Sequence, residues 1–174
     1  KITKKTKCVI SVNLYGNKPN YKKIIDLCNK YKLKIIEDGA QSFGSINSKK
    51  KLEKIHVMCT SFFPAKTLGC YGDGGACFTN SKRIYEKIRM LKILGQKRKS
   101  YSMLLGINSR LDTYQACVLL SKLDYYSKNL KKRFEIASLY KSLLEKINIE
   151  CLIDLSIKDN TCTSFPILIS NRDE

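Results

Sequence analysis

The stretch Ser61–Gly75 has the sequence Ser-Phe-Phe-Pro-Ala-Lys-Thr-Leu-Gly-Cys-Tyr-Gly-Asp-Gly-Gly. It places one lysine, Lys66, between an aromatic pair and a turn that holds four of the chain's nine glycines. Glycine lets the backbone approach a ligand closely, and a lysine beside an apolar wall is a candidate for Schiff-base chemistry. By its position alone, however, Lys66 is more simply interpreted as one surface lysine of a lysine-rich chain.

A second stretch, Ile35–Gly44, reads Ile-Ile-Glu-Asp-Gly-Ala-Gln-Ser-Phe-Gly and changes this interpretation. An apolar run that ends in carboxylates and small residues predicts a buried strand that opens into a loop. Ligands of open α/β sheets bind at that end of the strands. An acidic residue there, Asp38, and a downstream lysine are the two protein groups that a pyridoxal 5'-phosphate (PLP) site needs. The lysine forms the Schiff base, and the carboxylate pairs with the pyridinium nitrogen.

Strand, helix and strand patterns follow one another in the first part of the chain. Cys8–Leu14 is a β-rich apolar run, apolar residues recur at helical spacing over Tyr21–Tyr31, and Lys34–Glu37 returns as a strand. Such a βαβ unit predicts a parallel sheet with a right-handed crossover. We therefore expect an α/β fold with a mostly parallel sheet flanked by helices.

The remaining patterns predict further strands and helices around the two stretches. Strands are expected over 55–61, 75–79 and 162–169, and polar or basic loops over 45–54 and 96–105. One helix is expected between a cap at Asn80 or Ser81 and Gly95. Two more helices are expected, one opening at Leu111–Thr113 and a separate last one over 130–147.

Four motifs occur in an order that resembles the DegT/DnrJ/StrS family of PLP-dependent nucleotide-sugar aminotransferases. They are Glu37–Gly44, Ser61–Lys66, Leu68–Gly75 and Gly106–Asp112. The likeness is greatest to the branch that acts on UDP-2-acetamido-2-deoxy-3-oxo-glucuronate. It implies the aspartate aminotransferase type of fold (fold type I), in which this chain is an internal portion of a longer enzyme. The implied division is a partial PLP-binding large domain (1–127), a connecting helix (128–150) and the start of a small C-terminal α+β domain (151–174).

The resemblance also assigns the cofactor-binding residues. Lys66 matches the Schiff-base lysine, which also moves the proton between substrate carbon and cofactor. Asp38 matches the carboxylate that faces the pyridine nitrogen, although a helix cap or a surface acid is the alternative for this residue alone. Gln41 matches the contact to the phenolic oxygen of the ring, and Ser61 matches a ligand of the phosphate.

Three further residues are implied at the substrate side and between subunits. Asn108 matches a phosphate contact from the neighbouring subunit, which implies a homodimer with a shared active site; alone it is more simply a helix-start asparagine. Arg110 resembles the arginine that holds the sugar carboxylate across the dimer, where a planar guanidinium binds bidentately. Tyr71 is a weaker candidate for a substrate contact, with a packed aromatic residue as the alternative.

The resemblance implies transamination of a nucleotide-linked keto-sugar, of the UDP-3-keto-N-acetylglucosaminuronate type, with glutamate as amino donor. The product would serve synthesis of a cell-surface polysaccharide or glycan precursor. Retention of Lys66 favours transamination over the dehydration carried out by relatives that lack this lysine. Gly39 replaces the usual alanine, and Leu94 and Ser102 stand where many relatives have histidine, which leaves the substrate open.

The charge of the chain suggests a rival function. Its formal net charge is +18, and a basic domain is a candidate nucleic-acid binder. The excess is nearly all lysine, however, spread over every segment and without an RNP-like motif or a basic helix-turn-helix, which argues against nucleic acid. An anionic nucleotide-sugar would be attracted by the same field. A basic nucleic-acid-binding module or an inactive fragment without catalysis remain the alternatives.

The eight cysteines contain no C-x-x-C pair and mostly lie in apolar runs. This pattern predicts reduced, packed thiols rather than a disulfide framework or a metal site. The only histidine, His56, lies within an expected strand, which favours a structural role over catalysis. No apolar run is long enough for a membrane span, and the basic N-terminus lacks a signal-peptide pattern. A cytoplasmic protein is therefore expected.

Overall fold

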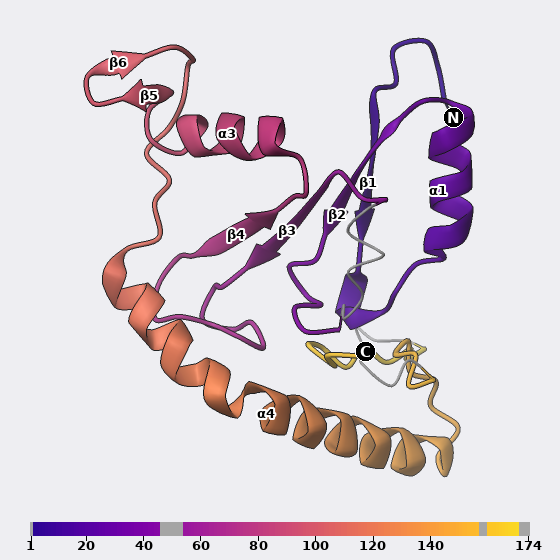
Figure 1. Cartoon of the computed structure of the whole chain (residues 1–174). Coiled ribbons are helices and arrows are strands. Elements are labelled where there is room, and N and C mark those ends of the chain that lie inside the picture. Colours follow the sequence, from indigo (N-terminus) through magenta and orange to yellow (C-terminus); the bar gives the residue numbers. More distant parts are fainter. Residues whose placement is uncertain (1, 46–53, 157–159, 171–174) are drawn as a thin grey trace.

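The computed structural model describes residues 2–45, 54–156 and 160–170, and the path of the chain is shown in Figure 1. The strands are β1 (Cys8–Val12), β2 (Lys34–Asp38), β3 (Val57–Ser61), β4 (Gly75–Phe78), β5 (Gln96–Arg98) and β6 (Tyr101–Ser102). The α-helices are α1 (Tyr21–Lys30), α3 (Lys82–Leu91) and α4 (Thr113–Glu145), and a 3-10 turn covers Leu14–Gly16.

The main sheet has the strand order β1-β2-β3-β4. Strands β1, β2 and β3 are parallel, and β4 pairs with β3 antiparallel. Helix α1 connects the parallel pair β1 and β2, so the expected βαβ unit and the α/β fold are confirmed. The expected loop over 45–54 lies almost wholly outside the described residues.

Helix α1 covers one face of this sheet. The side chain of Asn20 caps its N-terminus by accepting a hydrogen bond from Lys23 N at 3.1 Å. Its buried Cys28 packs in one cluster with Leu33, Ile35 and Ile55. Burial of these side chains fixes which residues of β2 point toward the core.

Alternation along the strands assigns the remaining side chains to two faces. The covered face carries Ile35 and Met58, which are buried. The opposite face carries Ile10 and Val12, whose side chains are 62% and 47% exposed. We call this second side the open face of the sheet.

Helix α4 is one continuous helix of 33 residues, where two separate helices were expected. No glycine or proline occurs between 113 and 145, so no residue in the sequence interrupts it. It extends about 50 Å and passes along the edge at which β1, β2 and β3 end (Figure 1). The expected boundary at 127/128 falls inside this helix, and the division into domains stays a prediction.

Two other expectations were wrong. Residues 96–105, expected to be a loop, contain the hairpin of β5 and β6. The segment 162–169, expected to be a strand, contributes only an isolated bridge from Ile167 to Cys151 in the described part of the chain. Pro166 offers no backbone N–H there, which works against a longer ladder.

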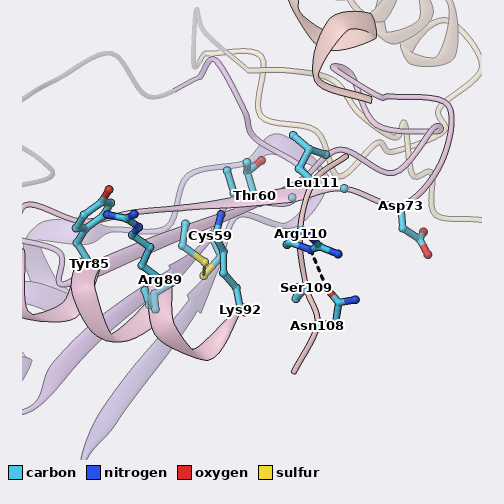
Figure 2. Close-up of a pocket in the computed structure, with 15 residues that line it drawn as sticks. Cys59, Thr60, Asp73, Tyr85, Arg89, Lys92, Asn108, Ser109, Arg110 and Leu111 are labelled. Atoms are coloured by element: carbon cyan, nitrogen blue, oxygen red, sulfur yellow. Dashed lines mark hydrogen bonds between the residues drawn. The ribbon is translucent and has the colours of Figure 1, made fainter. Parts of the chain in front are cut away.

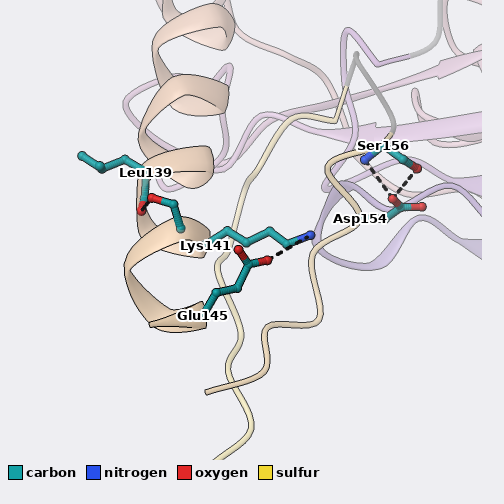
Figure 3. A network of polar contacts seen from close by, with 6 residues as sticks. Leu139, Lys141, Glu145, Asp154 and Ser156 are labelled. Atoms are coloured by element: carbon teal, nitrogen blue, oxygen red, sulfur yellow. Dashed lines mark hydrogen bonds and ion pairs between the residues drawn. The ribbon is translucent and has the colours of Figure 1, made fainter. Parts of the chain in front are cut away.

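The end of α4 and the segment that follows it carry local polar contacts (Figure 3). Lys141 and Glu145 form an i,i+4 ion pair at 3.9 Å on the exposed helix surface, where such a pair stabilises by only a few tenths of a kcal/mol. Asp154 Oδ1 accepts hydrogen bonds from the backbone N and the hydroxyl of Ser156 at 3.0 and 2.6 Å. These bonds shape the turn after the helix. Within the described residues, no helix combines the length and apolar character needed to cross a membrane.

Gly95 occupies a position that excludes a side chain. Its φ is +70°, and a Cβ there would lie 1.7 Å from the carbonyl oxygen of Leu104. We therefore expect Gly95→Ala to lower the free energy of unfolding of the full-length protein by about 1–3 kcal/mol, measured by urea denaturation.

Gly72→Ala is the matched control, because the nearest atoms to its Cβ belong to the flexible side chain of Gln115, at 3.1 and 3.6 Å. Equal losses of stability for the two variants would contradict this explanation of Gly95.

Candidate active site

The loop that carries Lys66 begins where β3 ends and is closed by backbone hydrogen bonds. Phe62 N donates to Gly74 O at 2.7 Å, Cys70 N donates to Phe62 O at 2.8 Å, and Lys66 N donates to Phe63 O at 2.8 Å. Phe62 and Cys70 are also buried in a core cluster. The loop is therefore anchored at both ends, and it presents a partly exposed Lys66 near the end of β3.

Gly69 makes this tight loop possible. A Cβ at this position would lie 2.5 Å from Pro64 O and 2.7 Å from Phe63 O, both backbone atoms. The glycine-dense turn after Lys66 thus has a packing reason as well as any role toward a ligand.

Asp38 and Ser61 lie on the same face of the sheet. Asp38 is the register partner of Cys59 on the parallel strand, and Ser61 follows Cys59 by two residues. Strand spacing and rise separate the Cα atoms of Asp38 and Ser61 by about 8 Å. Both residues end their strands on the open face, at the edge where the Lys66 loop starts.

A buried hydrogen-bond network fixes the loop that follows Asp38. Asn13 Nδ2 donates to Glu37 Oε1 at 2.7 Å and to Ser42 Oγ at 2.8 Å, while Tyr21 OH donates to Asn13 Oδ1 at 2.6 Å. Burial, followed by the nearby charge of Glu37, raises the pKa of Tyr21, which keeps this hydroxyl a donor. The network joins Asn13, directly after β1, to α1, β2 and the loop, so Asp38 is held between fixed neighbours.

The amide of Gln41 has a defined orientation. Its Oε1 accepts a hydrogen bond from Tyr15 N at 2.7 Å, and a backbone N–H requires the oxygen end of the amide. The NH₂ group is therefore the end of the amide that does not contact Tyr15 N. The main-chain carbonyl of Gln41 accepts bonds from the hydroxyls of Thr161 and Thr163 at 2.5 and 2.6 Å, which attach the segment after α4 to this loop.

Tyr126 of α4 joins the two loops of the candidate site. Its hydroxyl donates to Phe43 O at 2.5 Å and lies 2.9 Å from Thr67 Oγ1, next to Lys66 in sequence. Burial raises its pKa, so it stays protonated at neutral pH. Tyr126 is not among the residues expected at the site. Its only sequence signal is a tyrosine close to the apolar stripe of a helix.

A second contact from α4 holds the turn after Lys66. Lys122 Nζ donates to Gly69 O at 2.5 Å and lies 4.5 Å from the centre of the Tyr71 ring. Tyr71 N donates to Gln115 Oε1 at 2.7 Å. The Tyr71 side chain is 76% exposed, and its role as a substrate contact stays a prediction.

Asn108 and Arg110 lie together at a cavity next to the sheet. Arg110 Nε donates to Asn108 Oδ1 at 3.1 Å, and both residues line a cavity of about 900 Å³ between β3, β4 and α3 (Figure 2). The described residues that line it include three cationic side chains, those of Arg89, Lys92 and Arg110, and one carboxylate, that of Asp73. The cavity therefore suits an anionic ligand. Of the seven expected site residues, all in the described part of the chain, only Asn108 and Arg110 line it.

The histidine and the cysteines differ in how deeply they are buried. His56 Nδ1 accepts a hydrogen bond from Ile35 N at 3.1 Å, and burial and Lys34 lower its pKa, so it is a neutral structural residue as expected. The cysteines were expected to be packed. This holds for Cys28, Cys70 and Cys162 but is wrong for the exposed cysteines, which are Cys8, Cys77 and Cys117.

The bridge through Tyr126 can be tested by removing one hydroxyl. We expect Tyr126→Phe to lower the free energy of unfolding by about 1–2 kcal/mol, because two polar partners lose a buried hydrogen bond while the ring keeps its packing. We also expect PLP affinity, measured by fluorescence titration, to fall several-fold.

Tyr125→Phe is the control, because Tyr125 is the neighbour of Tyr126 on the same helix and its side chain is 66% exposed. If both variants behave like the wild type, Tyr126 does not hold the two loops.

A sequence profile of the DegT/DnrJ/EryC1/StrS aminotransferase family matches residues 1–174. The chain is 44% identical over 149 residues to the UDP-2-acetamido-2-deoxy-3-oxo-D-glucuronate aminotransferase of Pseudomonas aeruginosa, a match that covers 85% of this chain and 42% of that protein. This chain thus spans less than half the length of that relative.

Solved structures agree. A DegT/DnrJ/EryC1/StrS aminotransferase from Brucella abortus superposes with a TM-score of 0.84 at 35% identity, covering 96% of this chain and 45% of that one. NtdA from Bacillus subtilis, solved with the bound cofactor PMP, gives a TM-score of 0.86 at 31% identity, covering 99% and 40%. The expected fold type I architecture is thereby confirmed. Sequence, fold and arrangement of strand ends agree that this chain belongs to the DegT/DnrJ/EryC1/StrS family of PLP-dependent sugar aminotransferases.

Proposed function

We propose that this chain is part of a PLP-dependent aminotransferase that acts on a nucleotide-linked keto-sugar. The observation that carries the proposal is the shared direction of Asp38 and Ser61 on the open face, at the edge where the anchored Lys66 loop begins. Membership of the family supports the same activity.

The residues at this edge fit the chemical groups of PLP. The carboxylate of Asp38 would pair with the ring nitrogen, the NH₂ group of Gln41 would donate to the phenolic oxygen, and the hydroxyl of Ser61 would bind the phosphate. Lys66 would hold the cofactor covalently through its amine. When bound, PLP supplies a ring that accepts electron density from the substrate carbon.

The chain's own residues would perform three tasks in the reaction. Lys66 Nζ would take a proton from the substrate carbon and return it at the cofactor side, because it lies five residues after Ser61 in the anchored loop that begins at this edge. Asp38, backed by the buried network of Glu37, would keep a negative charge opposite the ring nitrogen. Helix α1, which packs on the covered face, would keep water away from that side of the strands.

The cavity beside α3 supports a proposal about the substrate. Arg110 would hold the carboxylate of a UDP-3-keto-N-acetylglucosaminuronate, and Asn108 would bind the cofactor phosphate of a partner subunit in a homodimer. Both residues line this cavity together with Cys59, which is the register partner of Asp38 on β2. Glutamate would be the amino donor, and the aminated sugar would be a precursor for surface polysaccharide. The 44% identity to the Pseudomonas aeruginosa enzyme favours this substrate class.

Covalent cofactor binding gives a direct test. We expect borohydride reduction of the full-length protein with PLP to attach the cofactor to the peptide that contains Lys66, seen by mass spectrometry. Lys66→Ala abolishes the adduct, whereas Lys82→Ala, which changes an exposed lysine of α3, leaves it intact. Labelling that persists in Lys66→Ala at the wild-type level would refute the role of Lys66.

The role of Arg110 can be separated experimentally from that of the residues that would bind the cofactor. We expect Arg110→Ala to raise KM for the uronate sugar at least about tenfold, because a charge-assisted hydrogen-bond pair is lost. The half-reaction with glutamate, followed by absorbance, should keep its rate. Arg98→Ala is the control, since this arginine lies on the exposed β5. Equal losses in both half-reactions would contradict a specific carboxylate contact.

A further inference from the structure

Two cysteines face each other across the antiparallel pair of β3 and β4. Cys59 and Cys77 are register partners, and their Sγ atoms lie 3.8 Å apart. Both residues line the cavity beside α3, and Figure 2 shows Cys59 on its sheet wall. Their thiols are not used in the mechanism above.

The hydrogen-bond pattern of the two strands favours close approach of these side chains. Phe62 N donates to Gly74 O, and Phe62 and Gly74 continue the register one step beyond the pair Ser61 and Gly75. Because hydrogen-bonded and non-hydrogen-bonded pairs alternate, the pair of Cys59 and Cys77 is non-hydrogen-bonded.

Such pairs have Cα atoms about 4.5 Å apart, within the range of about 4.4–6.8 Å that a disulfide spans. The sulfur atoms must therefore approach by only about 1.8 Å to bond, which is a side-chain movement. The backbone of the sheet can stay where it is.

The two thiols differ in accessibility. Cys77 is exposed, whereas Cys59 is only partly accessible. Burial first, and then Cys77 and Asp38, raise the pKa of Cys59 to about 11, so its thiol is a poor nucleophile toward a reagent in solution. Cys77 is therefore the thiol that meets an incoming oxidant, and Cys59 is the neighbour positioned to complete the reaction.

We propose that Cys59 and Cys77 are a redox-modification site that closes to a reversible disulfide between β3 and β4 by exchange with a low-molecular-weight disulfide. The Cys77 thiolate attacks one sulfur of the reagent, forming a mixed disulfide and releasing one thiol. Cys59 then loses its proton and attacks Cys77 Sγ, which expels the second thiol. The protein loses two electrons and two protons, and the reagent gains them.

Closure would change the wall of the cavity. The new bond would lie on the open face beside Asp38, which is the register partner of Cys59 on β2. The proposed disulfide follows from the pairing of β3 and β4 and does not depend on the proposed aminotransferase activity.

The test uses the full-length protein, oxidised glutathione as the reagent, and alkylation of remaining thiols under denaturing conditions. Trypsin cleaves after Lys66, so the disulfide would join two separate peptides, 55–66 and 67–82. We expect this cross-linked pair, about 2 Da lighter than the sum of the two reduced peptides, with fragment ions that assign Cys77 rather than Cys70. Dithiothreitol should separate the two peptides.

Variants identify the order of events. In Cys59→Ser we expect glutathione to remain attached to Cys77, whereas in Cys77→Ser we expect Cys59 to be recovered alkylated. Cys117→Ser, which removes an exposed cysteine of α4, should form the cross-link at the wild-type rate. Wild-type protein in which Cys59 and Cys77 are both alkylated, or each separately joined to glutathione, would overturn the proposal.

Discussion

The buried hydrogen bonds of Glu37 set the orientation of the whole candidate site. Glu37 is fully buried and accepts a hydrogen bond from Asn13, so it must point into the covered side of the sheet. Because side chains alternate along a strand, the next residue, Asp38, must then point to the open face. A slip of one residue in β2 would bury Asp38 and expose Glu37 to solvent, at a large cost for the unpaired polar groups. The network thus makes one register of β2 far more stable than its neighbours.

Helix α4 gives this edge its rigidity. Tyr126 joins the loop after β2 to the loop after β3, and Lys122 holds the turn at Gly69. Each contact links residues more than fifty positions apart in sequence, so each depends on the helix continuing unbroken past the strand ends. Loops carry chemistry most precisely when a rigid element fixes them from outside, and α4 supplies that support here.

The structure distributes the expected site residues over two locations. Asp38, Ser61 and the Lys66 loop share the edge of the sheet, whereas Asn108 and Arg110 lie in the cationic cavity beside α3. Cys59 lines the same cavity and is the register partner of Asp38, so the paired cysteines of β3 and β4 lie on the wall of this cavity beside Asp38.

The sequence by itself determined the α/β class, the order of the first strands and helix, and the positions of Asp38 and Lys66 at strand ends, because these follow from local periodicity and from short motifs. The 96–105 hairpin escaped prediction because its pairing depends on the close backbone contact between Gly95 and Leu104. The continuity of α4 was missed because breaks in apolar spacing were interpreted as an end, although no residue there stops a helix. Only the tertiary structure decided that Tyr126 would bridge two loops and that Arg110 would line a cavity together with Arg89 and Lys92. Such contacts between distant residues are set by how helices pack on the sheet, and local sequence patterns do not encode that packing.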